Sequence, residues 1–176
     1  MGGTVASGEE HTATLTPGTY SGNEGIGKTT LTTFCNDYNG FSIYAIGYTG
    51  NSYGNNTLLG ANTDITIPTG IYTEGDTTSK WSMRVDKVTD SSQTYNPANM
   101  TITNSFDSWH NVPTTYTRVA QYKATTGSSI TDNDKGAKVT TTYSAYASAN
   151  QAADTYEGQV KYTMVHPYDA AAPTPL

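Results

Sequence analysis

The chain has 176 residues, a formal net charge of −6 and only nine Lys and Arg residues, which are scattered along it. Binding to a nucleic acid duplex or to an anionic membrane depends on clustered basic residues, so this charge pattern argues against both partners. No apolar run approaches the ~18 residues that a membrane span requires, and the single Cys35 excludes an internal disulfide.

The composition favours strands over helices. Hydrophobic residues make up 35% and charged residues 14% of the chain, both below the roughly 45–50% and 25% of typical soluble domains. Thr, Ser, Asn, Gly and 14 Tyr take their place, and Thr and Tyr suit the half-buried surface of a sheet. The one helix candidate is a short Ala-rich segment at 144–152, and it lacks an apolar stripe.

The sequence predicts about eight to ten strands, and alternation marks the best of them, because successive side chains of a strand point to opposite faces. In chain order they span residues 11–16, 29–35, 41–49, 64–67, 80–88, 100–103, 115–123, 138–147 and 156–166. The last shows the clearest half-buried pattern. Residues 41–49 carry large side chains on both faces, which is typical of a central strand.

Turn-forming residues separate these strands. The segment from Asn36 to Gly40 supplies Asn, Asp and Gly for the positive φ angles of a hairpin turn, so we expect strands 29–35 and 41–49 to pair antiparallel. The pattern predicts an all-β fold, an antiparallel two-sheet sandwich of the immunoglobulin-like or jelly-roll kind. We expect a single domain over residues 1–168 and an Ala- and Pro-rich linker or tail over 169–176.

Residues 22–29 fit a phosphate-binding loop, G-x-x-x-x-G-K-[ST], with Gly22, Gly27, Lys28 and Thr29 at its required positions. Such a loop binds phosphate only where it opens a helix behind a buried strand. The residues that follow favour a strand and soon reach a turn. We therefore expect no nucleotide site and no enzymatic activity.

Other candidate sites are also weak. His11, His110 and His166 lie apart in the sequence, and none neighbours an activated Ser or Cys. The segment from Asp132 to Gly136 resembles the start of a calcium loop, but Tyr143 stands where the completing Glu would be. We expect no catalytic, cofactor-binding or metal-binding residues.

Two surface possibilities remain open. Exposed aromatic residues can stack on sugar rings, which makes residues 48–53 and the Trp109-His110 pair the candidate glycan-binding positions. The other possibility is an amide cross-link between a buried Lys and an Asn or Asp, assisted by a nearby acid, for which Lys28 and Glu157 are the first positions to inspect, although two solvated charges are the simpler interpretation.

Residues 153–163, with the sequence ADTYEGQVKYT, resemble the closing strand of bacterial cell-surface and pilin-like β-sandwich domains, which commonly end in A-G-T-Y-x-G-x-V-x-Y-T. In this closing-strand pattern, Asp154 stands where such domains usually have Gly. Residues 36–44 are similar to their N-x-x-x-G-aromatic-S hairpin. The resemblance implies an extracellular structural or adhesive module, such as a stalk, pilus or adhesin domain, with neighbouring surface domains or a host glycan as partners. A carbohydrate-binding module and a virion capsid or tail protein are the alternatives, and the oligomeric state is open.

Overall fold

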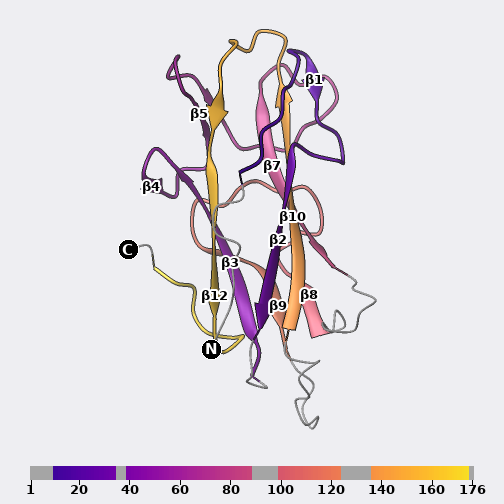
Figure 1. Cartoon of the computed structure of the whole chain (residues 1–176), viewed down its shortest axis with the longest axis vertical. Helices are drawn as coiled ribbons and strands as arrows, with labels where there is room; N and C mark the ends of the chain where they lie inside the picture. The colour runs from indigo at the N-terminus through magenta and orange to yellow at the C-terminus, as the bar shows by residue number, and fades with distance from the viewer. Residues whose placement is uncertain (1–9, 35–38, 89–98, 124–135, 175–176) are drawn as a thin grey trace.

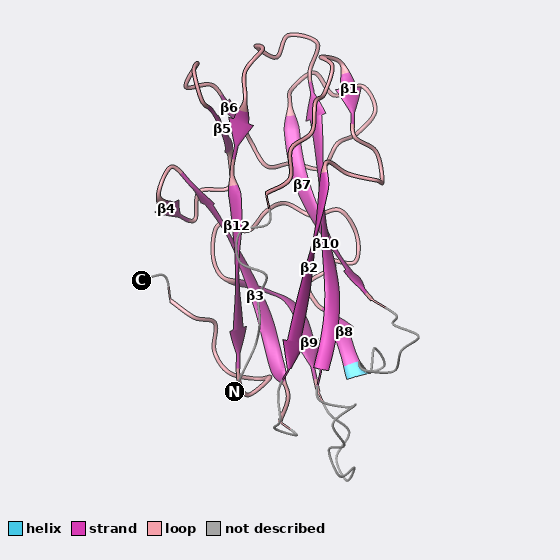
Figure 2. Ribbon diagram, viewed as in Figure 1, coloured by secondary structure: helices cyan, strands magenta, loops and turns pink. Residues whose placement is uncertain are grey.

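A computed structural model describes residues 10–34, 39–88, 99–123 and 136–174 (Figure 1). Strands make up 46% of these residues, none of them lies in an α-helix, and the strands form antiparallel sheets (Figure 2). The prediction of an all-β fold is confirmed. Three sheets are present, however, where two were expected.

The first sheet is organised around its longest strand, β10, which pairs along both edges. The register brings Thr141 opposite Thr29 on one side and opposite Val85 on the other. The strands of this sheet are β1 (Thr19–Tyr20), β2 (Gly27–Phe34), β7 (Lys80–Lys87) and β10 (Gly136–Ala147).

The second sheet is organised around β3, which pairs with β12 on one edge and with β9 on the other. Every β3 side chain except Tyr48 is buried, as expected for a central strand with large residues on both faces. The strands of this sheet are β3 (Phe41–Thr49), β4 (Ser52–Tyr53), β8 (Met100–Ile102), β9 (Thr117–Tyr122) and β12 (Gln159–Val165).

The third sheet is small and comprises β5 (Leu58–Gly60), β6 (Thr66–Ile67) and β11 (Tyr156–Glu157). It exists because the predicted strand 156–166 is interrupted at Gly158. The part before Gly158 pairs with β5, and the part after it pairs with β3. The continuous alternating pattern of residues 156–166 therefore corresponds to two strands that belong to different sheets.

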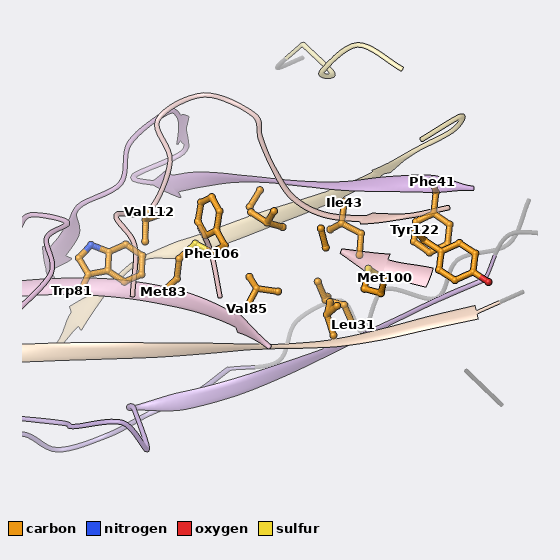
Figure 3. Close-up of a cluster of buried hydrophobic side chains, with 14 of the residues drawn as sticks. Leu31, Phe41, Ile43, Trp81, Met83, Val85, Met100, Phe106, Val112 and Tyr122 are labelled. Atoms are coloured by element: carbon orange, nitrogen blue, oxygen red, sulfur yellow. The ribbon is translucent and has the colours of Figure 1, made fainter. Parts of the chain in front are cut away.

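The hydrophobic core lies between the two larger sheets (Figure 3). Leu31, Val85 and Val139 reach it from the first sheet, and Ile43 and Val119 reach it from the second, with exposed fractions of 2% or less. Removing such side chains from water is the main favourable contribution to folding, at about 25 cal/mol per Å² of apolar surface.

Three local predictions were wrong. Strands β2 and β3 do not pair as a hairpin, because β12 and β9 occupy both edges of β3, and β2 pairs with β10 instead. Residues 11–16 form no strand, and the first strand is the two-residue β1. The helix candidate at 144–152 begins inside β10, where Ser144, Ala145 and Tyr146 pair with β7.

Gly40 makes the passage from one large sheet to the other possible. Its φ of +64° is a conformation that side chains disfavour. A Cβ at this position would also collide with the backbone carbonyl oxygen of Tyr122. The sequence predicted that Gly40 belongs to a hairpin turn between paired strands. The positive φ is present, but β2 and β3 belong to different sheets.

The segment after β12 is fastened to the outer face of the second sheet. Tyr44 Oη donates a hydrogen bond to the carbonyl oxygen of Ala170 at 3.0 Å, and the Arg118 guanidinium donates to the same oxygen at 3.3 Å. Ser42 Oγ donates to the carbonyl oxygen of Tyr168. These contacts cover the outer side of β3 and explain why Ser42 and Tyr44 are buried.

Asp154 is the residue at which the chain departs from the surface-domain pattern. It lies just before β11 and binds the turn between β5 and β6, so it links the strands of the third sheet. Its carboxylate accepts hydrogen bonds from Thr63 Oγ1 at 2.7 Å, from Asn62 Nδ2 at 2.8 Å and from the backbone N–H groups of Asn62, Thr63 and Thr155. The bond from Thr63 Oγ1, together with those from Asn62, lowers the pKa of Asp154 well below its ordinary value.

We predict a pH-dependent contribution of Asp154 to stability. A carboxyl group whose pKa is lowered by folding stabilises the fold above the unfolded-state pKa of about 3.9, and this contribution is lost as the pH falls further. The urea midpoint of the wild type should exceed that of Asp154→Ala at pH 7, and the gap should narrow below about pH 4. The exposed Asp107→Ala is the control. A gap that stays constant down to pH 2.5 would contradict the prediction.

Candidate functional site

The phosphate-loop motif lies in a strand and a turn. Strand β2 begins at Gly27, the residue before the motif's lysine. The backbone N–H groups of Gly25 and Ile26 donate to the carbonyl oxygens of Gly22 and Tyr143. These amides are thus engaged within the fold, whereas a phosphate loop directs its amides toward the ligand.

The two positions to inspect for an amide cross-link, Lys28 and Glu157, are both exposed. The Lys28 side chain is 51% exposed, and its Nζ lies 3.6 Å from Glu24 Oε2. Glu157 is exposed on β11. An amide cross-link needs a desolvated amine beside an acid or amide, so the simpler interpretation of two solvated charges fits this geometry.

The three histidines have different neighbours in the structure. His11 Nε2 lies 3.0 Å from Thr29 Oγ1, and His110 stacks on Phe106 with ring centroids 4.3 Å apart. His166 follows β12. Within the described ranges, no three His, Cys, Asp or Glu side chains gather as metal ligands would. The candidate calcium-loop residues 132–135 lie outside those ranges.

The candidate glycan position at 48–53 forms a tyrosine cluster on the outer face of the second sheet. Tyr48, Tyr53 and Tyr116 form this cluster, with ring centroids 5.0 Å apart for the first two and 6.5 Å apart for the last two. Lys161 Nζ lies 3.5 Å from the Tyr48 centroid and 4.5 Å from that of Tyr53. Because the ammonium group already occupies these ring faces, the cluster is a cation–π contact within the chain.

The second candidate glycan position begins at Trp109, whose ring is also covered. The guanidinium carbon of Arg84 lies 4.9 Å from the Trp109 ring centroid, and Arg84 Nε donates to Asp86 at 3.1 Å. The Arg84 guanidinium therefore covers one face of the Trp109 indole. The remaining candidate for a glycan-binding surface is the one beside His110.

A pocket of about 350 Å³ opens beside His110 and is referred to here as the loop pocket. Phe106 and Val112 form its buried floor, with exposed fractions of 0% and 1%, and the partly exposed Pro113 and His110, whose imidazole is stacked on Phe106, lie above them. Figure 3 shows Phe106 and Val112 at the end of the core that also holds Trp81 and Met83. The loop pocket thus rests directly on the packed core.

The remaining lining of the loop pocket is polar and uncharged: Asn56, Asn111, Thr114, Thr115 and Thr117. No carboxylate, ammonium or guanidinium group occurs among the described residues that line it. Amides and hydroxyls both donate and accept hydrogen bonds. This chemistry suits a ligand that carries hydroxyl or amide groups and no charge.

Backbone hydrogen bonds hold the wall of the loop pocket. His110 and Met83 exchange two of them, at 2.9 and 3.0 Å. Val112 N–H donates to Thr69 Oγ1 at 2.7 Å, and Asn56 Nδ2 donates to the Val112 carbonyl oxygen at 2.6 Å. A wall fastened at several points keeps its lining in place before a ligand arrives, which lowers the entropic cost of binding.

Sequence reasoning identified His110 but missed its partners. Asn56 lies in an Asn-rich turn that resembles many other turns, Thr115 begins a stretch predicted as strand, and Thr114 directly precedes it. Lys161 was recognised as a polar residue of the last strand, but its place between two tyrosine rings depends on the β12–β3 register. No local sequence signal marks these pairings.

We predict that Asn56→Ala loosens the wall of the loop pocket. Loss of the bond to the Val112 carbonyl leaves that oxygen without its partner, which costs about 1–3 kcal/mol. Urea unfolding measures this loss, and amide hydrogen exchange should speed up at 110–117. Asn111→Ala removes an exposed amide of the same lining, so it should change stability by less than about 0.5 kcal/mol. Equal effects of the two variants would show that Asn56 does not hold the wall.

Comparisons with family models, with curated proteins and with solved structures found no match for this chain. Among the described residues, no helix has the length and apolar character to cross a membrane. The site is therefore interpreted from its own geometry and chemistry.

Proposed function

We propose that this chain is a non-catalytic structural or adhesive module of a secreted or surface-displayed bacterial protein, such as a stalk, pilus or adhesin domain. In this proposal the two larger sheets act as a β-sandwich of the immunoglobulin-like or jelly-roll kind. Its partners are neighbouring domains of the same surface protein or a glycan of the host.

The observation that carries the proposal is the hydrogen bonding that holds the long strands together and attaches the segment after β12 to the second sheet. The longest strand, β10, is paired along both edges, and the long strands run along the length of the molecule (Figure 1). The segment that leaves β12 is bonded through Ala170 to Tyr44 and Arg118. A module that transmits load between neighbours needs such a firmly attached exit segment.

The surface chemistry supports the same proposal. Thr30 and Thr140 lie opposite each other across β2 and β10 at partly exposed positions, with their hydroxyl oxygens 3.5 Å apart. Hydroxyl groups of this kind keep a sheet compatible with water at low charge, while the backbone ladder holds it together. A fold stabilised in this way requires no cofactor.

The resemblance of residues 153–163 to the closing strand of surface domains agrees with this role. In the structure these residues contribute β11 and most of β12, so the resembling segment joins the third sheet to the second. The phosphate-loop motif, which alone would favour an enzyme, lies in an edge strand and its turn.

We predict that antibodies raised against the purified chain label intact cells of the bacterium that encodes it. External protease should remove the label without lysing the cells, and an antibody against a cytoplasmic ribosomal protein serves as the control for integrity. Label that appears only after the cells are permeabilised would contradict a surface role.

A further inference from the structure

The loop pocket has a size suited to a small ligand. Its volume of about 350 Å³ falls at the lower end of the roughly 300–1,000 Å³ that is typical of ligand sites. A polymer chain would need a longer groove, so the volume suits one ring or two. At the tyrosine cluster, by contrast, the Lys161 ammonium group covers one face of the Tyr48 and Tyr53 rings.

The charge around the loop pocket selects against ions. Its lining holds no acidic or basic side chain other than the imidazole of His110. An anionic ligand would meet no ammonium or guanidinium group there, and the net charge of −6 repels it at long range. A cationic ligand would lack a carboxylate partner in the lining. The ligand that fits is therefore neutral.

The polar groups of the loop pocket are available for a ligand. The side chains of Asn111, Thr114 and Thr115 are exposed, and none of them hydrogen-bonds to another residue that the structure describes. His110 Nδ1 lies 3.0 Å from the Asn111 carbonyl oxygen and donates to it, since a carbonyl only accepts. One amide and two hydroxyl groups thus line the pocket beside an aromatic ring.

We propose that the loop pocket binds one neutral sugar unit, a hexose or an N-acetylhexosamine, as the adhesive contact of this module. The apolar face of the sugar ring packs against the partly exposed rings of His110 and Pro113, with Phe106 buried beneath His110, and its hydroxyl groups bond to Asn111, Thr114 and Thr115. Sugars combine an apolar face with hydroxyl groups around the rim, which matches this division of the lining. The inference rests on the adhesive role proposed above.

The test is saturation-transfer NMR with the whole chain and methyl glycosides of glucose, galactose, mannose, N-acetylglucosamine and N-acetylgalactosamine, beside glucuronic acid and glucosamine. At least one neutral glycoside should bind, and the two charged sugars should bind at least about tenfold more weakly, because the lining offers no counter-charge. Absence of binding by all neutral glycosides at about 10 mM would overturn the proposal.

Variants then place the binding in the loop pocket. Thr115→Arg puts a long charged side chain into the pocket from an exposed position and should abolish binding, and Asn111→Ala should weaken it by about tenfold through loss of one hydrogen-bonding group. Thr78→Arg adds the same charge at an exposed position in the loop before β7 and should leave binding unchanged. Binding that survives Thr115→Arg, or that is lost equally in Thr78→Arg, would contradict the assignment.

The outcome is separable from the surface-labelling result. Surface label without sugar binding overturns the ligand assignment and leaves the structural role standing. Sugar binding without surface label overturns the proposed location and leaves the pocket chemistry standing.

Discussion

Two strands, β10 and β3, are paired along both edges, and the positions of the other long strands follow from them. Each pairs its backbone N–H and C=O groups with neighbours on two sides, and each sends alternate side chains into the core. A buried backbone group without a partner is costly, so each of these strands requires a partner on either side. The passage at Gly40 allows β2 to pair with β10 while β3 becomes the centre of the other sheet.

The strands were largely predictable from sequence, and their partners were not. Alternation located β3 to the residue, and β7 and β9 within two residues at each end, because burial of one face leaves a period-two pattern. The expected hairpin at 36–40 was wrong because Gly40 permits a turn but does not specify a sheet. Gly158 looked like part of a strand, yet it separates β11 from β12, because pairing partners far along the chain differ on its two sides.

The surface chemistry depends on this pairing. The β12–β3 register puts Lys161 over Tyr48 and Tyr53, so its ammonium group covers one face of each of these rings. The paired bonds between Met83 and His110 bring residues 110–117 against the end of the core, with Asn56 bonded to the same wall. An uncharged pocket thereby forms in an acidic chain. Most of its lining comes from residues 106–117, beside the Trp109-His110 pair that the sequence suggested, and the fold adds Asn56 from a distant turn.

Native-state hydrogen exchange tests the central role of the doubly paired strands most directly. Amides at 139–143 of β10, a segment paired on both sides, should exchange only through global unfolding, with an opening free energy equal to that from urea unfolding. Amides of the short strands β1 and β4 should open more readily. Opening of β10 at a free energy well below the global value, with slower exchange elsewhere, would contradict the account.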